Sequence, residues 1–161
     1  MLSHKLLMDD VEDNYHLLAI HSSMEEFKMA FLLNRNLQLR LKRATYDVDF
    51  NHGVVQALYP LYSYKEAAKH RTFYLVKNKY KGAVKKVVSS GSLFSEEEVS
   101  PQITYLIPEF NKVDYFLKIE DDLEEDHIQE LLNMIGKIPR VITTYTVDVN
   151  QLRSKNNLIV D

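Results

Sequence analysis

The chain has 161 residues, a formal net charge of −3, 45% hydrophobic residues and no cysteine. This length predicts one domain, and the hydrophobic content excludes intrinsic disorder, which is typical of chains with few apolar residues and a high net charge. The lack of cysteine excludes disulfides, thiolate metal ligands and cysteine nucleophiles. A net charge this small favours neither nucleic acid nor a membrane surface as a partner.

The N-terminal residues and the apolar runs predict where the protein resides. Four acidic residues stand where the apolar core of a signal peptide would run: Asp9, Asp10, Glu12 and Asp13. The longest unbroken apolar run, residues 29–33, is far below the roughly 20 residues that span a bilayer. We therefore expect a cytoplasmic protein without a membrane-spanning helix.

The first part of the chain predicts a strand and a helix. Residues 14–20 form a short apolar run with Tyr and Ile, which is typical of a strand. A helix is expected over about residues 23–36, where two overlapping capping boxes precede positions that recur at helical spacing. The capping boxes pair Ser22 with Glu25 and Ser23 with Glu26. The recurring positions are Phe27, Ala30, Phe31 and Asn34.

The middle of the chain predicts mainly strands. Alternating leucines predict one strand over about residues 37–50, with a bulge near Ala44 where the alternation shifts by one position. Two further strands are expected over about residues 56–66 and 72–80. Because Pro60 cannot donate a hydrogen bond to a neighbouring strand, the first of these two should lie at an edge of the sheet.

The second half of the chain predicts a loop, three strands and a helix. Residues 82–101 have no firm period and are rich in Ser and Glu, so we expect the main irregular loop there. Residues 123–137 predict a helix with acidic residues at its start, where the helix dipole favours negative charge. Strands are expected at three places: residues 103–107, 113–120 and 141–149.

These elements predict an α+β fold in a single domain. We expect a mainly antiparallel sheet of six or more strands, with two principal helices (about 23–36 and 123–137) packed on one face. The tail, residues 154–161, should either be flexible or add a strand to another sheet.

A weak internal repeat has two explanations: a βαβ duplication within this domain, or chance similarity. Residues 14–17 (NYHL) and 114–117 (DYFL) lie 100 positions apart. Each stretch opens a predicted strand, which is followed by an acidic helix start, a helix and a further strand.

No catalytic constellation is recognisable in the sequence. The six histidines lack the spacing of metal ligands, and His21 beside Ser22 lacks the turn motif of a serine hydrolase. We interpret His16 and His127 as ordinary strand and helix residues. We expect no catalytic residue, no metal ligand and no cofactor.

Charge is unevenly distributed along the chain. Residues 65–86 carry eight Lys and Arg against one Glu, while residues 96–126 carry eleven Asp and Glu against two Lys. Basic side chains interleaved with aromatic ones can stack the bases of single-stranded RNA. The basic-aromatic segment, residues 59–86, is therefore a candidate contact for RNA or for an acidic partner, through these residues: Lys77, Lys79, Lys81, Tyr74 and Tyr80. The alternative is that strand alternation turns the tyrosines into the core and leaves the lysines in water.

The most distinctive local pattern is the signature segment, residues 107–115. It is defined by six positions: Ile107, Pro108, Glu109, Val113, Asp114 and Tyr115. Pro108 ends a strand, and the carboxylates of Glu109 and Asp114 can accept hydrogen bonds from free backbone N–H groups. We favour a structural turn, and the alternative is an acid/base pair formed by the two carboxylates.

The six positions match the signature that names the IPExxxVDY family of small bacterial proteins. Residues 15–41 also resemble the N-terminal half of that family, so the resemblance covers most of the chain. It implies no activity, substrate or cofactor that could be assigned to these positions.

The sequence therefore favours a non-enzymatic protein that acts through contact with a protein partner, as an accessory subunit or as a homodimer. The alternative is an RNA-associated accessory factor that binds through residues 59–86. An enzyme built around Glu109 and Asp114 is a third hypothesis.

Overall fold

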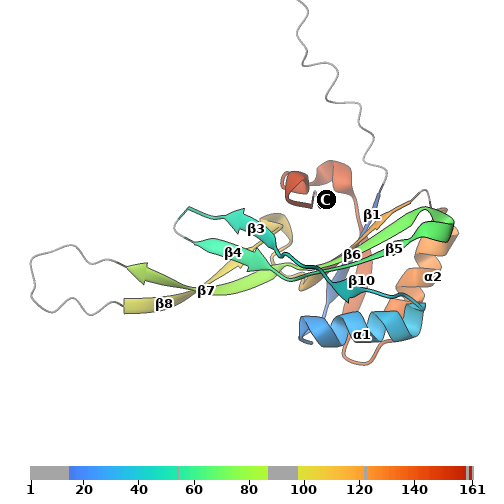
Figure 1. The fold of residues 1–161 in the computed structure, drawn as a ribbon, viewed down its shortest axis with the longest axis horizontal. Coiled ribbons are helices and arrows are strands. Elements are labelled where there is room, and N and C mark those ends of the chain that lie inside the picture. Colours follow the sequence, from blue (N-terminus) through green and yellow to red (C-terminus); the bar gives the residue numbers. More distant parts are fainter. Residues whose placement is uncertain (1–14, 54, 87–97, 122, 159, 161) are drawn as a thin grey trace, which may run out of the picture.

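The computed structural model describes residues 15–53, 55–86, 98–121, 123–158 and 160. In this part of the chain a six-stranded antiparallel sheet and two helices form the body, and two small sheets extend from it (Figure 1). The predicted α+β domain with two helices and a mainly antiparallel sheet is thereby confirmed.

The main sheet has the strand order β10-β1-β9-β6-β5-β2. Its strands are β1 (His16–His21), β2 (Lys42–Arg43), β5 (Leu61–Glu66), β6 (Arg71–Lys77), β9 (Tyr115–Glu120) and β10 (Thr143–Val147). The small sheets pair β3 (Val48–Asn51) with β4 (Gln56–Tyr59), and β7 (Lys79–Lys86) with β8 (Glu98–Tyr105). The helices are α1 (Glu26–Leu37) and α2 (Glu125–Gly136). Short 3-10 helices cover Ala67–Lys69, Pro108–Phe110, Val149–Gln151 and Lys155–Leu158.

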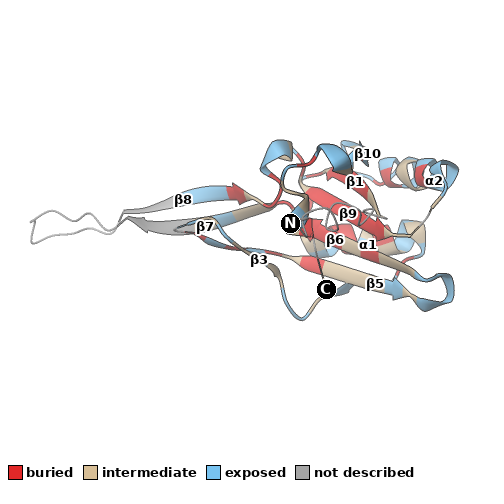
Figure 2. Ribbon diagram, turned by 90° about the horizontal axis from the view of Figure 1, so that it is seen from above, coloured by how far each residue is buried: buried red, intermediate tan, exposed pale blue. Residues whose placement is uncertain are grey.

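The main sheet is buried on both faces at its centre (Figure 2). Leu18 and Leu117 point to one face, where both helices pack, as predicted. Their neighbours Leu17 and Phe116 point to the other face, where the C-terminal 3-10 helices cover them. Strands buried on both sides need apolar residues at successive positions, which explains the continuous apolar runs in β1 and β9.

β1 and α1 recur as β9 and α2 with an offset of 99 residues rather than the predicted 100, but the strand after each helix does not repeat, because β10 pairs with β1 and β2 pairs with β5. β1 and β9 start 99 residues apart, as do α1 and α2. Leu18 and Leu117 are equivalent under this offset and also pair directly across the two strands. An offset of 100 would equate Leu17 with Leu117, which face opposite sides of the sheet, because successive strand residues alternate between faces.

The start of α1 differs from the predicted capping boxes. The helix begins at Glu26, and Glu25 at its N-cap makes no side-chain cap hydrogen bond. The Ser22 hydroxyl instead accepts a hydrogen bond from Met24 N at 3.3 Å and donates one to the Arg140 carbonyl at 2.9 Å. The serine therefore ties the approach to α1 to the loop before β10.

The single strand predicted over residues 37–50 is wrong. Only β2 and β3 form within it, and they belong to different sheets. Leu39 and Leu41 are buried in the core below α1 without a partner strand, because the Asn34 side chain accepts a hydrogen bond from Leu41 N and donates one to Leu41 O. An alternating pattern can thus come from a loop whose backbone is satisfied by a side-chain amide.

The strand predicted over residues 56–66 is interrupted at Pro60. β4 before the proline pairs only with β3, while β5 after it joins the main sheet beside β2. Proline lacks the N–H that a continuous strand would need at this position, so the chain changes sheets there.

The irregular loop predicted over residues 82–101 is too long. Residues 82–86 belong to β7 and residues 98–101 to β8, and the two strands pair along their whole length. A hairpin that extends from the body satisfies its backbone hydrogen bonds internally, so it does not require the alternating apolar pattern of a buried strand. Residues 87–97 lie outside the described residues.

The tail forms a short helix at Lys155–Leu158, and its addition of a strand to another sheet stays a prediction. These residues form a 3-10 helix, and Leu158 is buried against the face of the main sheet opposite the helices. The Lys118 ammonium donates a hydrogen bond to the Leu158 carbonyl at 3.0 Å. Apolar contact and this bond dock the tail onto its own domain.

Truncation of Leu117 tests the position of the core. Leu117 is fully buried in the central strand β9, so Leu117→Ala should destabilise the fold by about 2–5 kcal/mol through lost contacts and a cavity. At this chain length that is a fall in Tm of roughly 4 °C or more. Ile142→Ala, at a side chain that is 78% exposed, is the control and should melt like wild type; equal melting of both variants would contradict the fold.

Candidate functional site

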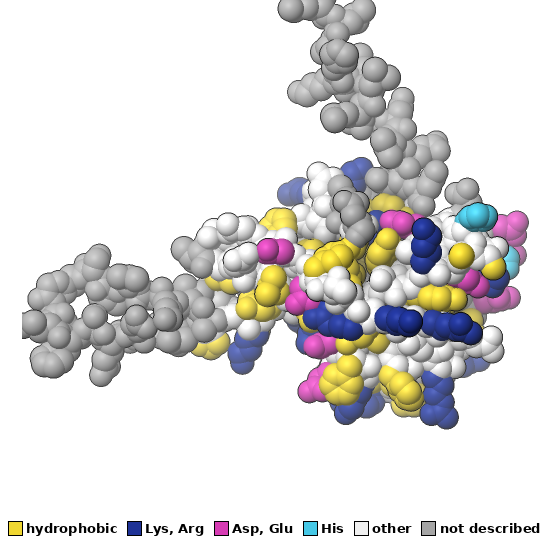
Figure 3. All heavy atoms as spheres, viewed as in Figure 1, with side chains coloured by type: hydrophobic (Ala, Val, Ile, Leu, Met, Phe, Trp, Pro, Cys, Tyr) yellow, Lys and Arg dark blue, Asp and Glu magenta, His cyan; other side chains and the backbone are white. Residues whose placement is uncertain are grey.

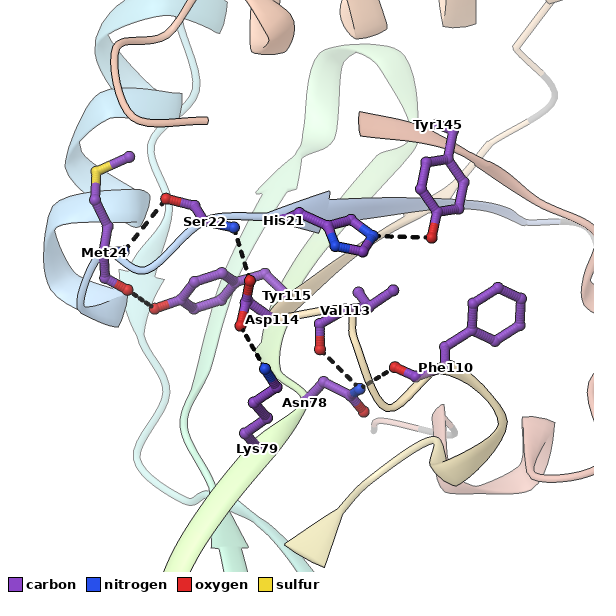
Figure 4. A network of polar contacts seen from close by, with 10 residues as sticks. All are labelled: His21, Ser22, Met24, Asn78, Lys79, Phe110, Val113, Asp114, Tyr115 and Tyr145. Carbon is purple, nitrogen blue, oxygen red and sulfur yellow. Dashed lines mark hydrogen bonds and ion pairs between the residues drawn. The ribbon is translucent and has the colours of Figure 1, made fainter. Parts of the chain in front are cut away.

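The signature segment is built around a buried side chain outside it, Asn78, which lies between β6 and β7 (Figure 4). Its Nδ2 donates hydrogen bonds to the carbonyls of Phe110 and Val113, both at 2.9 Å, and its Oδ1 accepts one from Ile107 N at 2.8 Å. Its backbone N–H donates to the Asp114 carbonyl. One amide therefore satisfies most of the inward-facing backbone groups of the turn.

Asp114 and Tyr115 connect the signature segment to the start of α1. The Asp114 carboxylate accepts a hydrogen bond from Ser22 N at 2.8 Å and forms an ion pair with the Lys79 ammonium at 2.9 Å. The Tyr115 hydroxyl donates a hydrogen bond to the Met24 carbonyl. Burial, with the nearby carboxylates, raises the pKa of Tyr115 far above its usual range, so this hydroxyl keeps its proton.

Glu109 contacts a different part of the chain, the C-terminal segment. Its exposed carboxylate accepts hydrogen bonds from the backbone N–H groups of Arg153 at 2.9 Å and Ser154 at 3.1 Å, and from the Ser154 hydroxyl. Partial burial raises the pKa of Glu109, but the hydrogen bonds from Ser154 and Arg153 outweigh it and hold the pKa below its ordinary value. The carboxylate anchors the C-terminal segment.

The two signature carboxylates therefore contact different elements, and the structure does not bring them together as an acid/base pair. Glu109 faces the C-terminal segment, and Asp114 faces the junction of β1 and α1. Within the described residues, no group of three or more His, Asp or Glu side chains could hold a metal ion. The described helices include none that is long and apolar enough to cross a membrane.

The basic-aromatic segment does not present its residues as one open platform. Lys77 forms an ion pair with Glu26 at 3.1 Å, and Lys79 is held by Asp114. The rings of Tyr74 and Tyr80 are half-buried. Tyr74 lies beside the Lys118 ammonium, and Tyr80 packs edge-to-face on Tyr59. Lys81 alone among the three lysines is exposed and has no ion pair with a described residue.

A surface that sequence reasoning missed lies on the outer side of α1. Phe27 and Phe31, one helical turn apart, are 55% and 62% exposed. The helix buries Met29, Ala30 and Leu33 instead. The helical spacing of the two phenylalanines indicated an inward stripe, but the stripe that meets the sheet is rotated away from them. The signal that could have found this is the second apolar stripe through Met29 and Leu33.

Two cations lie on the same helix as the two phenylalanines. Lys28 and Arg35 belong to α1, and Arg40 follows between α1 and β2. All three side chains are exposed, and none forms an ion pair with a described residue. Figure 3 shows Lys and Arg side chains in a row above hydrophobic side chains on the α1 side of the body. We call Phe27, Lys28, Phe31, Arg35 and Arg40 the basic α1 face.

Comparison with known proteins finds no family model, no curated protein and no solved structure that matches this chain.

Replacement of Asn78 tests whether the signature segment is a scaffold. Asn78→Ala removes three side-chain hydrogen bonds and leaves buried backbone groups without partners, so stability should fall by about 3 kcal/mol or more. Tm should decrease by roughly 6 °C or more. Asn36→Ala, which removes one exposed hydrogen bond to the Leu32 carbonyl, is the matched control. A melting curve for Asn78→Ala that coincides with the control would show that this network does not stabilise the fold.

Acid titration tests the anchoring role of Glu109. A carboxylate whose pKa is lowered by folding stabilises the protein above its unfolded pKa, about 4.3, and this stabilisation is lost as pH falls through the folded pKa. The Tm of wild type should therefore exceed that of Glu109→Gln at neutral pH, and the difference should shrink below about pH 4. Glu130→Gln, at an exposed carboxylate of α2, is the control. A difference that stays constant on acidification would contradict this role.

Proposed function

We propose that this protein is a non-enzymatic interaction module that binds an acidic protein surface through the basic α1 face. The observation that supports this most directly is the pair of exposed phenylalanines, Phe27 and Phe31, on a helix whose exposed Lys28 and Arg35 have no ion pair with a described residue.

Exposed aromatic pairs are typical of contact surfaces. Large aromatic side chains supply much of the binding energy at protein interfaces, where a partner removes them from water. Phe27 and Phe31 occupy adjacent turns of one rigid helix, so their spacing is fixed before binding. A partner would bury two rings at little cost in conformational entropy.

The charges specify the partner. Lys28 and Arg35 lie on the same helix as the rings, and Arg40 extends the positive charge beyond its end. Complementary potentials accelerate encounter and select partners of opposite charge. An amphipathic helix or groove with apolar residues and a rim of Asp and Glu fits this surface.

A second copy of the chain fits the basic α1 face less well. In a two-fold symmetric dimer the same patch of both copies meets itself. Lys28 and Arg35 of one copy would then approach the same cations of the other, which is unfavourable. The homodimer hypothesis therefore requires another surface.

RNA is the alternative ligand, through residues 59–86. The ion pairs of Lys77 and Lys79 with Glu26 and Asp114 reduce the positive charge available there, and the half-buried rings of Tyr74 and Tyr80 limit stacking. These contacts favour the protein partner, and RNA enters the test as a competing ligand.

The proposal can be tested with two synthetic amphipathic helices that share one apolar face and carry either Glu or Lys at every polar position. We expect the full chain to bind the Glu helix at least about tenfold more tightly, and binding should weaken with salt. Phe31→Ala should reduce affinity about 30-fold, as for a central aromatic contact. Met134→Ala, at an exposed side chain of α2, is the control, and both variants should melt like wild type.

Three results would contradict the proposal. The first is equal affinity for the Glu and Lys helices, and the second is unchanged binding by Phe31→Ala. The third is that a single-stranded RNA oligonucleotide binds more tightly than the Glu helix and is unaffected by Phe31→Ala, which would favour the RNA alternative. Sedimentation of the chain alone detects self-association through the same face.

A further inference from the structure

A pocket of about 550 Å³ lies on the face of the main sheet opposite the helices. One wall is the segment 43–46, which leads from β2 towards β3. The floor is formed by side chains from three neighbouring strands: Ser63, Lys65, Thr72, Tyr74 and Glu120. The pocket thus lies across the sheet from the buried side of α1 and is separate from the proposed protein contact.

The strand register arranges the floor in two rows. Lys65 lies opposite Thr72, and Thr72 opposite Glu120, so these three side chains cross β5, β6 and β9 in one line. Ser63 and Tyr74 form the next row. Neighbouring strands are about 4.8 Å apart, which places the backbones of the outer residues of the first row roughly 10 Å apart.

The two ends of the first row differ in charge. At the β5 end, Lys65 is exposed and has no ion pair with a described residue. At the β9 end, Glu120 forms an ion pair with the buried ammonium of Lys118 at 2.9 Å. The guanidinium of Arg43 is not available to the pocket, because it pairs with Asp47 and lies over the ring of Tyr62 on the helix side.

Three side chains that line the pocket carry aliphatic hydroxyl groups. Ser63 and Thr72 lie next to Lys65 on the floor, and Thr45 belongs to the wall. A hydroxyl can donate to a charged oxygen, as can a lysine ammonium. The β5 end therefore offers several donors to one anionic group, while the carboxylate of Glu120 can accept only from a hydroxyl or amino group.

We propose that this pocket binds a small phosphomonoester, with its phosphate at Lys65, Ser63 and Thr72 and its hydroxyl or amino groups towards Glu120. A phosphate presents several strong acceptor oxygens and needs donors from several directions, which this end of the pocket supplies. The volume lies within the range of small-molecule sites, about 300–1,000 Å³, and therefore exceeds what a bare ion requires.

Calorimetric titration of the full chain with adenosine monophosphate and with ribose 5-phosphate tests this site. Both should bind in the micromolar to low millimolar range, and Lys65→Gln should weaken both by about tenfold, because a charge-assisted contact is lost. Thr72→Val, which removes one hydroxyl at similar volume, should weaken both several-fold. Lys69→Gln changes an exposed lysine that pairs with Glu66 outside the pocket, and it should bind like wild type.

Adenosine and inorganic phosphate separate the contributions of the two ends. Adenosine should bind at least about tenfold more weakly than adenosine monophosphate, and inorganic phosphate should compete only weakly. The proposal is overturned if adenosine binds as tightly as its monophosphate, if Lys65→Gln binds like wild type, or if neither phosphomonoester binds at about 10 mM. Phe31→Ala should leave this binding unchanged, so failure here is distinguishable from failure of the proposed protein contact.

Discussion

The side-chain amide of Asn78 is the interaction on which most of this structure depends. It stands where the chain leaves the main sheet after β6 and enters the β7–β8 hairpin, and it is fully buried there. An amide can donate two hydrogen bonds and accept more than one, and Asn78 uses these on the carbonyls of Phe110 and Val113 and on the N–H of Ile107. A buried turn without such partners would lose about 1–3 kcal/mol for each unsatisfied group, so one residue fixes both the exit of the hairpin and the return of the chain into β9.

The same turn determines where α1 lies. The Asp114 carboxylate accepts a hydrogen bond from Ser22 N, and the Tyr115 hydroxyl donates one to the Met24 carbonyl. Ser22 and Met24 precede the first turn of the helix. The signature segment therefore fixes the position of the basic α1 face, although none of its side chains belongs to that face. A change at Asp114 should be expected to alter partner binding only by moving Phe27 and Phe31 with the helix.

The sequence was sufficient for the elements that carry one strong periodicity and insufficient where two patterns compete. α2 and the central strands could be predicted because their apolar residues have one arrangement that buries them. α1 carries two apolar stripes, and only the packed structure shows that Met29 and Leu33 are buried while Phe27 and Phe31 stay exposed. The leucines after α1 alternate like a strand, yet Asn34 supplies the hydrogen bonds that a partner strand would have made. The pocket could not be predicted, because its floor depends on the register of three strands from distant parts of the chain.

Charge follows the same logic, because the availability of a cation depends on its neighbours in space. Lys77 and Lys79 belong to the most basic stretch of the sequence, yet each forms an ion pair, Lys77 with Glu26 and Lys79 with Asp114. Lys118 is buried, and the Leu158 carbonyl and Glu120 satisfy it. Lys28 and Arg35 belong to a second basic stretch, residues 27–46, which has five Lys and Arg and no Asp or Glu, and they remain exposed on the helix that carries two exposed phenylalanines. Lys28 and Arg35 have no ion pair with a described residue, and this separates the basic α1 face from the paired lysines around the signature segment.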